Sequence, residues 1–132
     1  MKIQIKNRYT EKVIIEGEAE NLKEFLKKNR EADLREADFR GADLYGANLS
    51  ESNLYGADFR GADLRKATLY GADLRKATLC EADLYGADFR GADLRKATLY
   101  ESDLYKADLS EATITTNQKD GIIKSLGIIV KK

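Results

Sequence analysis

Carboxylates would have to carry most acid–base or metal chemistry in this chain, which has 23 Asp and Glu residues and no His. Without His, the usual general base near neutral pH, the commonest transition-metal ligand and Ser-His or Cys-His nucleophiles are all absent. One cysteine, Cys80, excludes an intramolecular disulfide. The glycines are not followed by the Lys-Ser/Thr of a phosphate-binding loop. We therefore expect no enzymatic activity, no cofactor and no metal.

The aspartates belong to a pattern that recurs every five residues from residue 31 to residue 115. A small residue, nearly always Ala, is followed two places later by Leu, Phe or Ile, and Asp, Asn or Thr stands between them. The large series runs without a break through 17 units, from Leu34 to Ile114. Two further residues, such as Arg-Gly, Tyr-Gly or Arg-Lys, complete each unit.

Neither a helix nor a flat strand can bury this pattern. On an α-helix, a step of five residues rotates by about 140° net, so the large residues would occupy every face. On a strand, an odd spacing sends successive large residues to opposite sides. A chain that turns a corner once per unit can point every large residue at a common axis, and its coils can then stack. The pattern predicts an all-β solenoid with Asp, Asn and Gly in the turns.

The motif A-D/N-L-x-x, as in residues 32–36 (ADLRE) and 47–51 (ANLSE), resembles the pentapeptide repeat family. The resemblance covers residues 31–115. It implies a right-handed quadrilateral β-helix with four pentapeptides per coil, or about four coils, in which the small and large residues point inward. It also implies that Cys80 points outward, as an ordinary exposed thiol.

The flanking segments predict end caps, because open solenoid ends expose strand edges and apolar side chains. In residues 1–30 we expect strands over 2–6 and 12–16 and a helix over 21–30, with Asn21 and Glu24 at capping-box spacing. In residues 116–132 we expect a weak helix over 117–126, interrupted by Gly121, then a C-cap at Gly127 and a short strand over 128–130. The alternative is that these segments form an interface.

Four units per coil would place aspartates in one column, about 4.8 Å apart. That spacing resembles the carboxylate pair of a retaining glycosidase. Equivalent carboxylates on a convex surface, however, lack a pocket that could give them different roles or enclose calcium. We expect them to accept hydrogen bonds from the local backbone. The column comprises Asp43, Asp63, Asp83 and Asp103.

Tyr and Arg would also stack in columns at the first turn position. One column is Tyr45, Arg65, Tyr85 and Tyr105; another is Arg35, Tyr55, Arg75 and Arg95. Such ladders could stabilise the rod through cation–π contacts. They could instead bind a partner, because Tyr and Arg are typical hot-spot residues. The column of Tyr45, Arg65, Tyr85 and Tyr105 is the candidate interaction surface.

Three functions compete: a protein-binding scaffold, a DNA mimic that binds DNA gyrase as some family members do, and an enzyme. The net charge is zero: +3 for residues 1–30, −6 for 31–115 and +3 for 116–132. A DNA duplex as long as the rod carries about 12 negative charges, so gyrase is an unlikely partner. Lysines at the basic ends are usually just solvated, and no apolar run could span a bilayer. We predict a cytoplasmic protein scaffold that binds neither nucleic acid nor membrane; the sequence indicates no oligomeric state.

Overall fold

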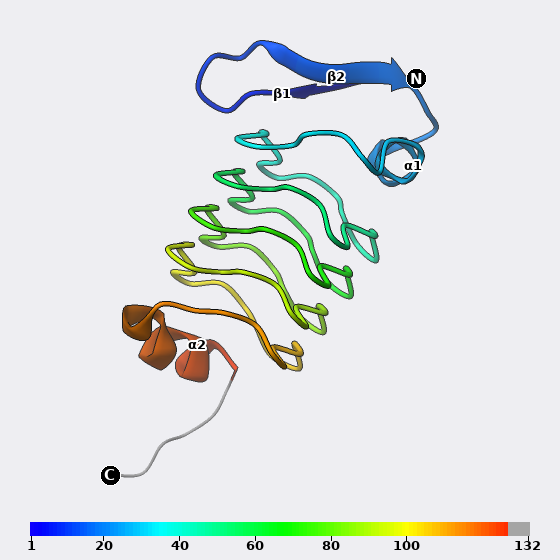
Figure 1. The fold of residues 1–132 in the computed structure, drawn as a ribbon. Helices are drawn as coiled ribbons and strands as arrows, with labels where there is room; N and C mark the ends of the chain where they lie inside the picture. The colour runs from blue at the N-terminus through cyan, green and yellow to red at the C-terminus, as the bar shows by residue number, and fades with distance from the viewer. Residues whose placement is uncertain (127–132) are drawn as a thin grey trace, which may run out of the picture.

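The computed structural model describes residues 1–126. Two short groups of elements flank a long segment that winds in stacked coils (Figure 1). The predicted C-cap at Gly127 and the strand over 128–130 lie outside the described residues. None of the helices within residues 1–126 has the length and apolar character needed to cross a bilayer. The elements are β1 (Lys2–Lys6), β2 (Val13–Glu18), α1 (Leu22–Lys28), η1 (Thr116–Gln118) and α2 (Lys119–Ser125).

Isolated parallel bridges join successive coils. Each bridge pairs residues that are twenty positions apart, from Asp33↔Asn53 to Asp93↔Thr113. Twenty residues are four pentapeptides, the number per coil that the family resemblance implies. Because the bridges run in the same register from the first coil to the last, a residue's position within the twenty-residue coil determines which corner it occupies.

A tight turn at the end of every unit produces the corners. Ala62 N donates to the Phe59 carbonyl at 3.0 Å, and the second turn residue, Gly61, has φ 68°. This combination defines a type II turn, which requires a positive φ at its second central residue. Seven units place Gly there, whereas nine place Glu or Lys at φ between 57° and 63°. A residue with a side chain costs about 1–2 kcal/mol in this conformation, so the turns store strain.

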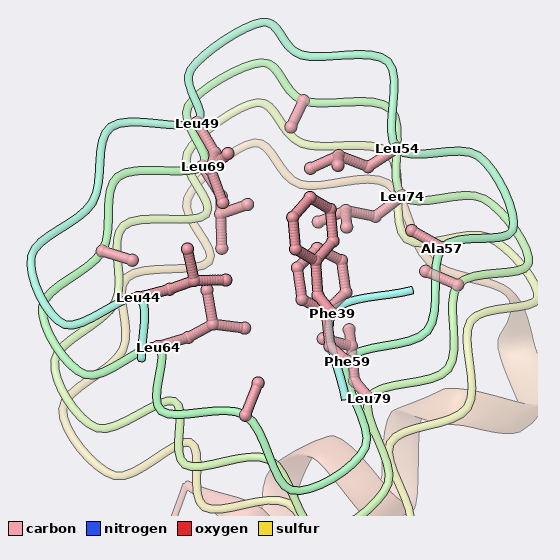
Figure 2. Packing of buried hydrophobic residues seen from close by; sticks show 14 of the residues in the cluster. Phe39, Leu44, Leu49, Leu54, Ala57, Phe59, Leu64, Leu69, Leu74 and Leu79 are labelled. Atoms are coloured by element: carbon pink, nitrogen blue, oxygen red, sulfur yellow. The ribbon is translucent and has the colours of Figure 1, made fainter. Parts of the chain in front are cut away.

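The large residues of successive coils stack inside the coils (Figure 2). The Phe39 and Phe59 rings lie 5.1 Å apart and nearly parallel, and the leucines beside them are fully buried. Burial is incomplete among the large residues of the last coil, although Leu104 is fully buried there. Leu99 and Leu109 are half-buried there, and Ile114 is 37 % exposed. These residues have no further repeat coil beneath them.

The N-terminal segment forms an antiparallel hairpin and a short helix above the first coil (Figure 1). The predicted first strand coincides with β1, but the second prediction was wrong in its bounds, because β2 begins at Val13 and continues to Glu18. The helix is also shorter than predicted, since Asn21 is its N-cap and Asn29 its C-cap. Asn21 accepts a hydrogen bond from Glu24 N at 2.9 Å, which forms one half of the expected capping box. Phe25 and Leu26 are buried.

Hydrogen bonds from the N-terminal segment occupy the upper edge of the first coil. Asp38 N donates to the Lys6 carbonyl at 2.8 Å, and Arg8 N donates to the Glu36 carbonyl at 2.7 Å. On another side of the coil, the Arg30 guanidinium donates to the Ser50 carbonyl at 2.7 Å. No earlier coil precedes this edge, so its main-chain groups need other hydrogen-bond partners. The hairpin and the Arg30 side chain supply them.

The C-terminal elements lie against the lower edge of the last coils (Figure 1). The Gln118 amide donates to the Leu94 and Ala97 carbonyls at 2.6 and 2.7 Å. The predicted interruption at Gly121 was wrong: a 3₁₀ turn begins at Thr116, and α2 then runs through Gly121 to Ser125. The predicted apolar face is present, with Ile122 buried and its neighbours Ile123 and Leu126 half-buried.

Candidate functional site

The structure places the four residues of the candidate interaction column at the same corner of successive coils. The Arg65 guanidinium carbon lies 5.2 Å from the centre of the Tyr45 ring. The Tyr85 and Tyr105 rings lie 5.9 Å apart and are tilted by 37°. The column therefore consists of two contacting pairs, Arg65 stacked on Tyr45 and, below them, the tilted rings of Tyr85 and Tyr105. Tyr45 and Tyr105 are 39 % and 51 % exposed, so both pairs present aromatic surface to solvent.

The second predicted column also stacks. The Arg75 guanidinium lies over the Tyr55 ring at 5.4 Å, and Lys76 approaches the same ring at 5.7 Å. A third corner carries a similar pair that the sequence analysis did not single out, Arg90 over Tyr70 at 5.5 Å. Because three corners carry an Arg–Tyr stack, such a contact alone does not distinguish a binding surface from a stabilising ladder.

The column of aspartates performs the local structural role that the sequence predicts. Each carboxylate accepts a hydrogen bond from the backbone N–H two residues later, as Asp43 does from Tyr45 N at 3.2 Å and Asp103 from Tyr105 N at 2.9 Å. Parallel bridges join the four aspartates in register. Within residues 1–126, no cluster of acidic, Cys or His side chains could hold a metal ion. Cys80 is half-buried, which corrects the expectation of an exposed thiol.

Sequence reasoning missed an ion pair inside seven of the units. In each, the Asp before the large residue receives hydrogen bonds from the Arg after it, as Asp63 does from the Arg65 Nε and Nη2 at 2.8 and 2.7 Å. These hydrogen bonds lower the pKa of the Asp63 carboxyl and raise that of Arg65. The signal was present in the letters D-L-R and D-F-R, whose charged residues flank one inward side chain. The pairs are Asp33–Arg35, Asp38–Arg40, Asp58–Arg60, Asp63–Arg65, Asp73–Arg75, Asp88–Arg90 and Asp93–Arg95.

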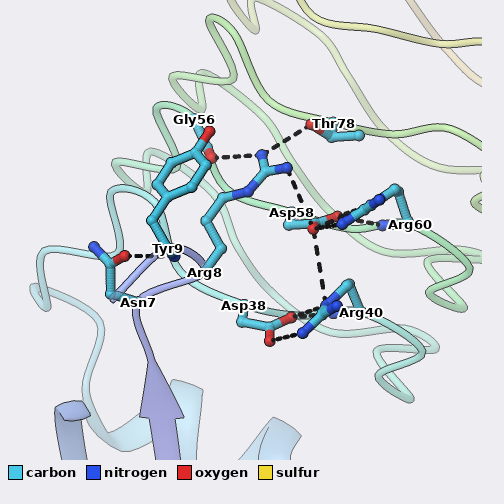
Figure 3. Close-up of polar contacts among 9 residues, drawn as sticks. All are labelled: Asn7, Arg8, Tyr9, Asp38, Arg40, Gly56, Asp58, Arg60 and Thr78. Atoms are coloured by element: carbon cyan, nitrogen blue, oxygen red, sulfur yellow. Dashed lines mark hydrogen bonds and ion pairs between the residues drawn. The ribbon is translucent and has the colours of Figure 1, made fainter. Parts of the chain in front are cut away.

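Asp58 differs from the other six paired aspartates, whose side chains are 24–54 % exposed, because its side chain is only 1 % exposed. Arg8, from the loop between β1 and β2, covers it at 3.3 Å, and Arg60 binds it at 2.6 Å (Figure 3). Burial opposes ionisation of Asp58, but the hydrogen bonds from Arg60 and the charge of Arg8 outweigh it and lower the pKa. This cluster fixes the hairpin loop to the side of the stacked coils.

Comparison with known proteins places these features in context. The family profile described as pentapeptide repeats matches residues 42–79 and 79–115, with eight copies. A pentapeptide repeat protein from the thylakoid lumen of Arabidopsis thaliana is 27 % identical, with a TM-score of 0.50 over 70 % of this chain and 75 % of that one. Such neighbours imply a right-handed quadrilateral β-helix. No curated protein matches the chain.

Two further solved structures are more distant in shape. A pentapeptide repeat protein from Nostoc PCC 7120 is 33 % identical, with a TM-score of 0.37 over 59 % of this chain and 84 % of that one. QnrB1, a plasmid-mediated fluoroquinolone resistance protein, is 23 % identical, with a TM-score of 0.40 over 76 % of this chain and 66 % of that one. TM-scores this low give no basis for inferring the role of the present chain from these two proteins.

Proposed function

The chain belongs to the pentapeptide repeat family, and from this premise we propose that it is a non-catalytic scaffold that binds another protein. The proposed binding surface is the column Tyr45, Arg65, Tyr85 and Tyr105. The proposal includes the finer description of the fold, a right-handed quadrilateral β-helix of four pentapeptides per coil. In this description the N-terminal hairpin with its helix and the C-terminal helix are end caps.

The exposure of the column supports its use as a binding surface. Tyr45 and Tyr105 are among the exposed large hydrophobic residues of the chain, and the Arg65 side chain is 46 % exposed. Tyr and Arg contribute much of the affinity at protein interfaces, because they offer a large contact area together with hydrogen bonds. Stacking holds the two pairs in place before a partner arrives, which reduces the entropy lost on binding.

The ionisation of the arginine-paired carboxylates supports a non-catalytic role. A general acid or base needs a pKa near the working pH, whereas Asp63 is held ionised by Arg65. The same pairing disfavours imitation of DNA, because seven of the carboxylates that could stand in for phosphates each hold an arginine. We therefore do not propose DNA gyrase as the partner.

Occupied coil edges support the assignment of the two ends as caps. Unpaired strand edges promote association with other chains. Here the hairpin meets the first coil through Lys6 and Arg8, and the Gln118 side chain meets two carbonyls of a late coil. These contacts leave the sides of the rod, including the interaction column, as the accessible surface.

Affinity capture from the source cell tests the proposal. The bait is compared with a variant carrying Tyr45→Ser and Arg65→Ser, and with a control carrying Tyr70→Ser and Arg90→Ser. The control removes an equivalent stacked pair from a different corner. We expect a protein that the wild type and the control recover and the column variant loses, with direct binding of the purified partner as confirmation. Recovery of the same proteins by all three baits would show that the column is not the binding surface.

A further inference from the structure

One corner of the rod carries four basic side chains on two successive coils, Arg75 and Lys76 above Arg95 and Lys96. The bridge between Asp73 and Asp93 sets this register, and Lys76 N donates to the Arg95 carbonyl at 3.1 Å. Within residues 31–115, Lys76 and Lys96 are the only two lysines at the second turn position that lie twenty residues apart and hence one above the other. Positive charge is therefore concentrated at this corner.

The arginines of this cluster are neutralised, but the lysines are not. Arg75 pairs with Asp73 at 2.7 Å, and Arg95 pairs with Asp93 at 2.6 Å. Neither lysine takes part in an ion pair among residues 1–126. Four basic and two acidic groups leave a net charge of +2. Like charges on neighbouring strands repel each other, and an anion bound between the two lysines would relieve that repulsion.

The four basic side chains line a shallow hollow of about 310 Å³ together with Tyr55 and Thr115. Tyr55 also lines a second hollow of about 360 Å³, toward the N-terminal hairpin, which Ile14 and Arg35 border. Since Tyr55 belongs to both, the two hollows follow one corner along the length of the rod. We call this corner surface the trough: two hollows with Tyr55 between them and the unpaired lysines at the C-terminal end.

We propose that this trough binds an extended acidic segment of a partner protein. Lys76 and Lys96 lie on neighbouring coils, about 4.8 Å apart along the rod. Alternate side chains of an extended peptide lie about 6.7 Å apart on one face, so two carboxylates reach both flexible lysines. An apolar side chain of the peptide covers Tyr55. This inference rests on the proposed scaffold function, but it uses a different corner from the Tyr45–Tyr105 column.

A nucleic acid fits the trough less well than a peptide does. A strand of DNA or RNA carries a phosphate at every nucleotide and needs a positive track of similar length. Beyond Tyr55 the trough runs past Asp33 and Glu36, which would repel the phosphate of each further nucleotide, whereas the proposed segment needs carboxylates only at Lys76 and Lys96. The next corner along the chain carries Glu81 above Glu101, so the positive surface ends there as well.

Isothermal titration at low salt tests the inference with a synthetic peptide that has two glutamates at alternate positions, followed two residues later by a tyrosine, and no other acidic residue. The matching glutamine peptide serves as the negative control. The test variant carries Lys76→Gln and Lys96→Gln. The control variant carries Lys27→Gln and Lys28→Gln, which removes the same charge from exposed positions on α1, away from both proposed binding surfaces. We expect the test variant to bind at least about fivefold more weakly and the control variant to bind within about twofold of the wild type.

Other outcomes would overturn the inference. An equal loss in both variants would mean that the peptide responds only to overall charge. Tighter, lysine-dependent binding of an oligothymidylate would assign the trough to single-stranded nucleic acid. A dimer seen by sedimentation and lost in the Lys76/Lys96 variant would assign it to a second copy of the chain. If the Tyr45/Arg65 variant fails to change protein capture while peptide binding persists, only the proposed use of that column fails.

Discussion

The Arg8 guanidinium lies 3.3 Å from the carboxylate of Asp58 and joins the N-terminal hairpin to the second coil. The same guanidinium donates to the Gly56 carbonyl at 3.1 Å and to the Thr78 hydroxyl at 2.9 Å (Figure 3). One side chain therefore contacts two successive coils. The Arg8 side chain is only 12 % exposed, so these contacts are shielded from solvent and contribute more than surface ion pairs do.

Replacing Arg8 with Ala should lower the free energy of unfolding by about 2 kcal/mol, because Asp58 and Thr78 lose a buried charged donor. Arg60 still holds Asp58, which keeps the loss below that of an isolated buried charge. Urea denaturation followed by circular dichroism measures the change. Arg35→Ala is the control, because its pair with Asp33 is exposed and should cost less than about 1 kcal/mol. Equal losses in the two variants would contradict a special role for Arg8.

Acid should destabilise the fold through the Asp-x-Arg pairs. Hydrogen bonds from the paired arginines hold the pKa values of Asp73 and Asp93 below their ordinary value of 3.8. As the pH falls, these aspartates therefore bind protons in the unfolded state before they do so in the folded state. The contribution of the pairs to the free energy of unfolding is complete above the aspartate pKa of the unfolded state. It is lost as the pH drops through the lower pKa values of the folded state. We expect a constant urea midpoint from neutral pH to about pH 5 and a decline below about pH 4.

A variant with Asp73→Asn and Asp93→Asn isolates these two pairs. It should be less stable than the wild type at neutral pH, and its urea midpoint should decline less steeply in acid. An unchanged slope would show that other carboxylates cause the acid sensitivity.

The same Gly→Ala substitution should have opposite effects at two positions. At Gly61 it should destabilise by about 1 kcal/mol, because φ is 68° there although nothing lies within 4 Å of an added Cβ. At Gly121, within α2, the added Cβ also meets nothing, and Ala should stabilise the helix by up to about 1 kcal/mol. Thermal melts of the two variants provide the test. Shifts of the same sign would contradict the assigned turn conformation.

Core truncation should cost far more in the middle of the rod than at its C-terminal end. Leu79→Ala removes a fully buried side chain between two coils and should cost about 2–5 kcal/mol. Ile114→Ala acts on a side chain that is 37 % exposed and should cost less than about 1.5 kcal/mol. Hydrogen exchange should show increased opening of the coils on both sides of Leu79, because each repeat depends on its neighbours. Comparable losses in both variants would contradict this gradient.

The five-residue spacing was enough to predict the buried positions, since a side chain at a fixed place in each turn must return to the same axis. It also predicted which Tyr and Arg residues stack, such as Tyr45 with Arg65, once four units per coil were assumed. The burial of Asp58 could not be predicted, because it depends on Arg8, whose position is set by the tertiary docking of the hairpin. The exposure of Ile114 depends likewise on how far the C-terminal elements extend beneath the last coil.

The constant twenty-residue register limits how this chain can change in length. Adding or removing twenty residues keeps every downstream side chain at its original corner, whereas a change of five turns all that follows by one corner relative to the hairpin. The identical stretches at 54–70 and 84–100 are offset by 30 residues, or 30/20 = 1.5 coils, and so face opposite sides. Whole-coil edits should thus preserve the alignment of surfaces such as Tyr45–Tyr105, and quarter-coil edits offer a way to rotate one half of the molecule against the other.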